Sequence, residues 1–201
     1  MAIATRLPSF PRLTWLAPFS LLAGCTGIPD GTRAVTDFRL EPYLGQWYEI
    51  ARLPHGFEEG LSCVTATYTQ RDDGGVRVVN RGYNLSEGEW DIAEGKAYFI
   101  EEPSVGRLKV SFFGPFYGGY NILELDDDYR HALVAGPDRD YLWILAREPQ
   151  IGEATYRSLV ERARELDFPV DELIRVEQDP AVCPEPPLEK TPQKFGQVSN
   201  S

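Results

Sequence analysis

Three cysteines and two histidines are the side chains of this 201-residue sequence best suited to nucleophilic catalysis or metal binding. His55 is expected in a loop. His131 follows the carboxylate run at 126–128, and His131 with those carboxylates could hold a metal ion. Carboxylates at a hairpin usually face water, which favours a polar turn there and a solvated loop for Glu58 and Glu59. The sequence contains no Gly-x-Ser-x-Gly, Gly-x-Gly-x-x-Gly or Cys-x-x-Cys motif. It therefore predicts no enzymatic activity, no metal site and no cofactor.

Cys25 stands at the end of an N-terminal segment with the features of a secretory signal. Arg6 and Arg12 give it a positive start, and the apolar run 13–22 is shorter than the roughly 20 residues that span a bilayer. The run leads into Leu-Ala-Gly-Cys, which resembles the lipobox of bacterial lipoproteins and implies removal of residues 1–24 and acylation of Cys25. Several acyl chains, at about 0.8 kcal/mol per buried CH₂, anchor a protein stably to a membrane. An ordinary signal peptide followed by a chance cysteine is the alternative.

Cys63 and Cys183 are the cysteines that remain after such a cleavage. In an exported protein an even pair favours a disulfide, which here would tie the C-terminal segment to an early strand. Such a bond would close a long loop, and long loops have the largest entropic effect on the unfolded chain. Two free thiols are the alternative.

Short runs of alternating apolar residues, separated by turn residues, fill the sequence from residue 45 to residue 147. They predict about eight β-strands, at 46–53, 63–69, 76–81, 93–100, 108–113, 117–125, 131–135 and 141–146. The short connections favour an antiparallel meander. Composition alone leaves two arrangements open, a closed barrel with room for one small ligand and a two-sheet sandwich.

The segments outside these strands are a tether, one helix and a polar tail. Residues 25–36 lack periodicity and predict a flexible tether, and the proline-rich residues 184–201 predict a disordered tail. Apolar residues recur at helical spacing from about 152 to 166, which predicts an amphipathic helix with one face to bury. A short final strand is expected at 173–176, so the folded domain would extend from 37 to 183.

The charge of the sequence argues against nucleic acid as a partner. The net charge is −11, and the lysines and arginines are scattered along the chain. A protein that tracks phosphates needs a basic patch or stripe. The sequence predicts no such surface, and so no nucleic-acid binding.

Two motifs resemble signatures of the lipocalin family. Gly45-x-Trp47 resembles the motif that opens the first lipocalin strand, and the run 136–147 resembles the last-strand signature, which ends in an arginine, here Arg147. The resemblance implies an all-β fold, namely an eight-stranded antiparallel up-and-down β-barrel with the C-terminal helix packed outside. It also implies that Trp47 and Arg147 stack to close the barrel floor. Further segments resemble the bacterial outer-membrane lipocalin lipoproteins, and with them the likeness covers nearly all of 37–178: 48–52, 64–68, 94–99 and 109–121.

The same resemblance implies a function. It implies that the barrel binds a fatty acid or a lysophospholipid, serves envelope maintenance or a stress response, and could pair as a homodimer. The lipobox, followed by Thr26 rather than an aspartate, implies a lipid anchor in the bacterial outer membrane, facing the periplasm. Cys63 with Cys183 resembles the strand-to-tail disulfide of animal lipocalins such as apolipoprotein D.

Two alternatives to a lipid carrier stay open. One is a lipocalin-type enzyme with a reactive cysteine in the barrel, for which Cys63 is the candidate. Alternation from Ala66 points Cys63 away from the cavity, which disfavours that enzyme. The other alternative is a structural envelope lipoprotein whose barrel is filled by its own side chains.

Side-chain alternation assigns the inner face of the expected barrel. Small inward residues such as Ala66 leave room for a ligand, and a packed barrel without a cavity is the alternative. Asn80, Tyr117 and Tyr141 could hydrogen-bond a ligand headgroup near the mouth. The residues predicted to bind the ligand are Ala66, Tyr68, Val78, Asn80, Ala97, Phe99, Val110, Phe112, Tyr117, Asn121, Tyr141, Trp143 and Leu145.

Overall fold

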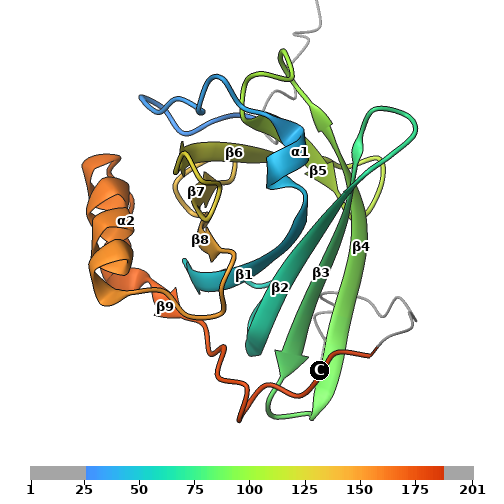
Figure 1. Ribbon diagram of the computed structural model, residues 1–201, viewed down its shortest axis with the longest axis vertical. Helices are drawn as coiled ribbons and strands as arrows, with labels where there is room; N and C mark the ends of the chain where they lie inside the picture. The colour runs from blue at the N-terminus through green and yellow to red at the C-terminus, as the bar shows by residue number, and fades with distance from the viewer. Residues whose placement is uncertain (1–25, 188–201) are drawn as a thin grey trace, which may run out of the picture.

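The strands from β1 to β8 follow one another around a closed antiparallel barrel in the computed structural model, which describes residues 26–187 (Figure 1). Strand β1 pairs with both β2 and β8, and these pairings close the ring. The closure confirms the predicted eight-stranded up-and-down barrel and excludes the two-sheet sandwich. The strands are β1 (Gly45–Arg52), β2 (Leu61–Gln70), β3 (Val76–Asn84), β4 (Glu89–Phe99), β5 (Arg107–Ser111), β6 (Gly118–Leu125), β7 (His131–Ala135) and β8 (Leu142–Ala146).

Strand β1 can pair with both β2 and β8 because it bends in the middle. Its first half pairs with β2 and its second half with β8. The register against β8 shifts between Glu49 and Ala51, and a bulge of this kind bends a strand. A short ninth strand, β9 (Ile174–Arg175), pairs with β1 outside the ring, close to the strand predicted at 173–176.

Trp47 and Arg147 close the barrel floor, beside the short helix α1 (Leu40–Tyr43). The Trp47 ring is fully buried, and its Nε1 donates a hydrogen bond to the Tyr43 carbonyl at 2.8 Å. The Arg147 guanidinium lies 4.0 Å from the centre of that ring and donates to four backbone carbonyls at 2.6–3.2 Å. Gly45 has a φ of +94°, a conformation that glycine adopts readily. The predicted Trp–Arg stack is confirmed.

Helix α2 (Glu153–Glu165) packs on the outside of the barrel, as predicted for residues 152–166 (Figure 1, orange). Its buried residues, Leu159 and Ala163, belong to an apolar cluster with Leu133 and Ile144 on the outer wall. The helix thereby buries the one apolar face that its sequence pattern indicated. A 3₁₀ turn, η1 (Val170–Glu172), follows it. None of the helices within residues 26–187 is both long and apolar enough to cross a bilayer.

The segment before α1 lies along the barrel wall. The backbone N–H of Val35 donates to the Ile122 carbonyl at 2.9 Å, and the Asn121 side-chain amide donates to the Gly27 carbonyl at 3.0 Å. This arrangement differs from the predicted flexible tether, because these contacts fix residues 26–36 against the barrel at several points. The predicted acylation site Cys25, the signal peptide and residues 188–201 of the predicted tail lie outside the described residues.

The predicted disulfide between Cys63 and Cys183 is confirmed, and it joins residues 120 positions apart. Cys63 has a φ of +56° and sits where the pairing of β2 with β3 shifts register. Its N–H leaves the ladder and donates to the Glu177 carbonyl at 2.8 Å. Gln178 then bridges β1 and β2 through its side-chain amide. The C-terminal segment is thus fastened across the outer side of these strands.

Candidate functional site

The barrel encloses a cavity of about 120 Å³ between its floor and the β1–β2 loop, residues 53–60. Side chains from all eight barrel strands contribute to the wall, and most of them are apolar. Phe57 of the loop lines the cavity and is also 42% exposed, which identifies this end as the mouth. The interior is therefore partly empty, in contrast to the predicted alternative of a filled barrel.

Alternation placed most of the predicted residues correctly on the inner face. The alternation of inward and outward side chains holds where the strands pair regularly, as β3 does with β4 along its whole length. The predicted residues that line the cavity are Ala66, Tyr68, Val78, Asn80, Ala97, Val110, Phe112, Trp143 and Leu145.

The inward placement of Asn121 is wrong, because the parity of β6 is shifted by one residue. Tyr120 pairs with the inward Leu108 and lines the cavity in its place. The Asn121 amide points out of the cavity and donates to the Gly136 carbonyl at 2.9 Å. Tyr117 precedes the strand, and the ammonium group of Lys109 on the outer wall lies 5.1 Å from its ring centre. Neither Asn121 nor Tyr117 lines the cavity.

Phe99 and Tyr141 were also predicted to line the cavity, and neither does. Phe99 packs in the inner apolar cluster, with its ring centre 6.1 Å from that of Phe38 at the floor. Tyr141 precedes β8 and stacks against Phe57 and Trp143, with ring centres 5.9 Å and 6.2 Å apart. It faces a separate surface groove beside the mouth.

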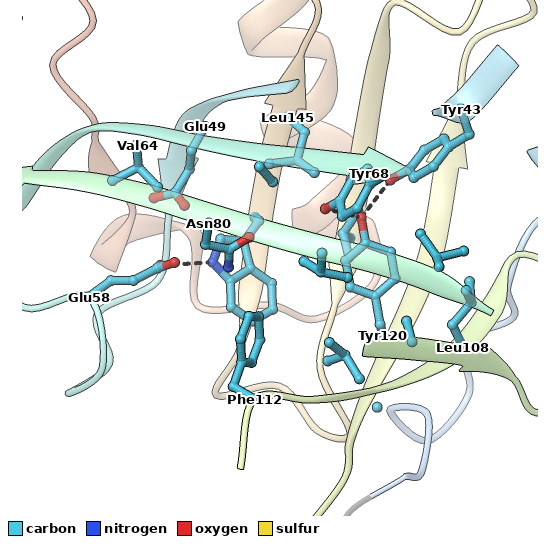
Figure 2. Close-up of a pocket in the computed structure, with 18 of the residues that line it drawn as sticks. Tyr43, Glu49, Glu58, Val64, Tyr68, Asn80, Leu108, Phe112, Tyr120 and Leu145 are labelled. Carbon is cyan, nitrogen blue, oxygen red and sulfur yellow. Dashed lines mark hydrogen bonds between the residues drawn. The ribbon is translucent and has the colours of Figure 1, made fainter. Parts of the chain in front are cut away.

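Three tyrosine hydroxyls form the polar group at the floor end of the cavity (Figure 2). The Tyr120 hydroxyl lies 2.6 Å from that of Tyr43 and 2.9 Å from that of Tyr68. Burial raises the pKa of each of these phenols, so they stay protonated and neutral. This end of the cavity can accept or donate hydrogen bonds but carries no charge.

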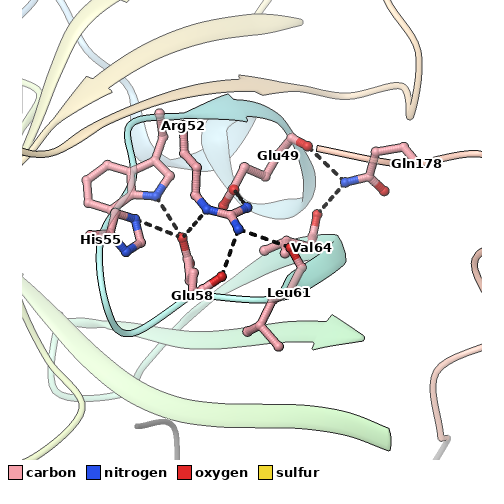
Figure 3. A network of polar contacts seen from close by, with 8 residues as sticks. Glu49, Arg52, His55, Glu58, Leu61, Val64 and Gln178 are labelled. Atoms are coloured by element: carbon pink, nitrogen blue, oxygen red, sulfur yellow. Dashed lines mark hydrogen bonds and ion pairs between the residues drawn. The ribbon is translucent and has the colours of Figure 1, made fainter. Parts of the chain in front are cut away.

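A buried ionic network forms the other polar group, at the mouth (Figure 3). Arg52 donates to the Glu49 carboxylate at 2.8 Å and to the backbone carbonyls of Glu58 and Leu61. The Glu58 carboxylate accepts a hydrogen bond from Trp143 Nε1 at 3.1 Å. His55 Nε2 lies 3.1 Å from the same Glu58 oxygen. Glu49 and Glu58 both line the cavity, so its mouth is acidic.

Sequence reasoning missed this network. Glu58 was expected to be solvated, yet it is 2% exposed because the β1–β2 loop folds back over the barrel. Nothing local in the sequence signals that fold-back. Glu49 carried a usable signal, since it shares the inward parity of Trp47 on β1. The acidic turn at 126–128 is a polar turn as predicted, with Asp126 accepting hydrogen bonds from two backbone N–H groups.

Burial, and then the neighbouring Glu58, raises the pKa of Glu49 well above its ordinary value. The native state therefore holds a proton that the unfolded chain releases at lower pH. In acid, this bound proton raises the free energy of unfolding. The stabilisation is lost as the pH rises from 4.5, the ordinary pKa of a glutamate, through the higher pKa of Glu49 in the native state.

Glu49→Gln keeps the neutral form at every pH, so it is expected to reduce the loss of stability between about pH 5 and about pH 8. Urea unfolding of the variant and the wild-type protein at the two pH values measures the difference. Glu153→Gln, on the exposed face of α2, is the matched control and should retain the wild-type pH profile. Equal profiles for Glu49→Gln and the wild-type protein would contradict the assignment of this titration to Glu49.

Comparisons with known proteins agree with this architecture. The family model of the lipocalin-like domain matches residues 38–178. The protein named Outer membrane lipoprotein Blc from Citrobacter freundii is 56% identical over 150 residues, which cover 75% of this chain and 85% of that protein. Its namesake from Vibrio cholerae is 52% identical over 159 residues, covering 79% and 93%. Insecticyanin from the tobacco hornworm Manduca sexta shares the fold, with a TM-score of 0.63 at 22% identity, covering 79% and 90% of the two chains.

Proposed function

The chain belongs to the lipocalin family, and we propose that it is a membrane-anchored carrier that holds a single-chain lipid, a fatty acid or a lysophospholipid, in its barrel. The observation that carries the proposal is the partly empty cavity, with apolar walls between two polar ends. Burying an alkyl chain there at roughly 25 cal/mol per Å² supplies the binding energy. Reversible sequestration of this kind would serve envelope maintenance or a stress response.

The size of the cavity bears on how such a ligand would fit. About 120 Å³ is close to the volume of an engineered cavity that takes a benzene-sized molecule. To hold a long acyl chain with its head at the mouth, the cavity would therefore have to enlarge, for example by an outward shift of Phe57. Arg52 and Trp143 hold the β1–β2 loop by hydrogen bonds to the backbone carbonyl and the carboxylate of Glu58.

The membrane location is inferred from the N-terminal sequence and from the names of the relatives. The two bacterial relatives are named outer membrane lipoproteins. Together with the Leu-Ala-Gly-Cys ending at Cys25, this supports a lipid anchor in a bacterial outer membrane. The anchor would keep the barrel beside its source of lipid.

We propose binding without catalysis. The reactive-cysteine alternative needs a thiolate at Cys63, and the sulfur of Cys63 is bonded to Cys183. Within residues 26–187 no group of three His, Cys, Asp or Glu side chains is arranged to hold a metal ion. The relatives and the fold class support a binding protein.

Ala66→Leu should weaken binding of a palmitoyl chain by roughly tenfold, because the added side chain takes up space inside the cavity. Thr65→Leu makes a similar addition one residue earlier on β2, where alternation points the side chain outward. Its affinity should stay within about twofold of the wild-type value. Fluorescence titration of protein carrying Cys25→Ser, which lacks the acylation site, measures both variants. Equal affinities for Ala66→Leu and Thr65→Leu would argue against the cavity as the binding site.

Native mass spectrometry of the same Cys25→Ser protein tests the function itself. We expect a co-purifying single-chain lipid that organic extraction releases and identifies. Protein that carries no lipid and takes up none of a panel of fatty acids and lysophospholipids would overturn the carrier proposal. A structural role of the barrel would then be the better explanation.

A further inference from the structure

The two ends of the cavity differ in charge (Figure 2). The floor end carries neutral tyrosine hydroxyls, whereas the carboxyl groups of Glu49 and Glu58 line the mouth end. Within the described part of the chain, no lysine or arginine lines the cavity. A ligand that enters head-outward therefore meets an acidic surface where its polar group comes to rest.

Arg52 is the positive charge next to these carboxyl groups, and its donors are already committed. They bond to the Glu49 carboxylate and to the carbonyls of Glu58 and Leu61, while its Nε lies 3.9 Å from the Glu58 carboxylate (Figure 3). Glu49, Arg52 and Glu58 are each less than 5% exposed. One guanidinium and the His55 imidazole, whose Nε2 lies 3.1 Å from Glu58, thus face two buried carboxyl groups, and neither Arg52 nor His55 lines the cavity.

Asn80 gives independent evidence for a missing donor at this end. Its Oδ1 is buried and has no hydrogen-bond partner among residues 26–187. The side chain lies on β3 and lines the same cavity as Glu49 and Glu58 (Figure 2). Buried acceptors are rarely left without a donor, because the desolvation cost is then not recovered. A ligand group that donates hydrogen bonds would satisfy it.

We propose, on the basis of the carrier function above, that the mouth end is a subsite for a hydrogen-bond-donating head that is neutral or cationic. Among single-chain amphiphiles, a glycerol ester with free hydroxyls or a head with an ammonium group fits it. An ionised carboxylate fits poorly, because it would lie beside Glu49 and Glu58 in a medium of low dielectric constant, so the inference narrows the ligands proposed above by making the fatty acid the weaker of the two. The acidic mouth thereby selects among lipids that share the same alkyl chain.

The protonation of the carboxyl pair is consistent with this selection. Burial and the proximity of Glu58 raise the pKa of Glu49, which favours a proton on its carboxyl group in the absence of another cation. An ammonium head would replace that proton, which passes to the solvent, and the net charge of the subsite would be unchanged. A hydroxyl head would donate to Asn80 or to a carboxylate without any proton transfer.

Three ligands with the same alkyl chain test the proposal: dodecylammonium, 1-dodecanoylglycerol and dodecanoate. Isothermal titration of the Cys25→Ser protein at about pH 8, below the critical micelle concentrations, measures the three affinities. The wild-type cavity is expected to bind the ammonium and the glycerol ester roughly tenfold more tightly than the carboxylate. Glu58→Gln keeps an acceptor for Trp143 and leaves Arg52 paired with Glu49, and it should reduce the ammonium preference to about twofold.

Glu153→Gln removes the same charge from the outer face of α2 and is the matched control, which should retain the full preference. Equal or tighter binding of dodecanoate by the wild-type protein would overturn the inference but leave the carrier function intact. An undiminished ammonium preference in Glu58→Gln would also overturn it. If none of the three ligands binds, the carrier function itself fails. The ratio of the ammonium and carboxylate affinities of the wild-type protein is decisive by itself, so the test still holds if Glu58→Gln does not fold.

Discussion

Trp47→Ala is expected to lower the free energy of unfolding by about 3–5 kcal/mol, the range found for large aromatic side chains removed from a core. The Trp47 ring has no exposed surface and packs 4.8 Å from the Tyr43 ring, centre to centre. Its loss also removes the surface on which the Arg147 guanidinium stacks, an interaction of up to roughly 2 kcal/mol where water is excluded. Urea unfolding followed by circular dichroism measures the change.

Phe116→Ala is the control for this experiment, because Phe116 is an aromatic residue that is 78% exposed. Its substitution should change the unfolding free energy by no more than about 0.5 kcal/mol. Trp47 does not line the cavity, so the folded fraction of Trp47→Ala should still bind lipid. A loss below about 1 kcal/mol would mean that the floor is not a main source of stability.

The barrel could be predicted from the sequence because the patterns that indicate its strands and turns are local. Strand alternation has a period of two, and one inward residue on a regular strand assigns all the others. The same reasoning failed on β6, where Gly118 and Gly119 carry no side chain to show which face is buried. Tyr120 and Asn121 both suit a half-buried strand, so the sequence does not show which of them points inward. The pairing of Tyr120 with the inward Leu108 determines it, and that pairing is a tertiary contact.

The chemistry at the mouth could not be predicted in the same way. The burial of Glu58 depends on a loop that folds back and on Trp143 from β8, 85 residues away. A charged residue in a loop is usually solvated, so local reasoning pointed in the opposite direction. Buried carboxyl groups lower stability unless they are paired, and here Arg52 and the Trp143 N–H supply the partners from distant parts of the chain. The apolar wall thus accounts for the alkyl chain, and the part of the site that sequence reasoning missed would decide its head.

The double variant Cys63→Ala with Cys183→Ala is expected to lose up to about 4–5 kcal/mol of stability, the chain-entropy value for a loop of this length. The bond spans 120 positions and so encloses nearly the whole barrel. Its main effect is on the unfolded state, whose ensemble it restricts. The native contacts of the C-terminal segment remain, since Gln178 still bonds to the carbonyls of Glu49 and Val64.

Urea unfolding distinguishes this mechanism from a loss of native packing. If the bond acts on the unfolded chain, the variant keeps the lipid affinity of the wild-type protein while its unfolding midpoint falls. Wild-type protein with its disulfide reduced should behave as the variant does. Gln178→Ala, which removes native contacts but keeps the bond, is the matched control and should cost only about 1–3 kcal/mol. A double variant that unfolds within about 1 kcal/mol of the wild-type protein would show that residual structure in the unfolded chain already supplies the restriction.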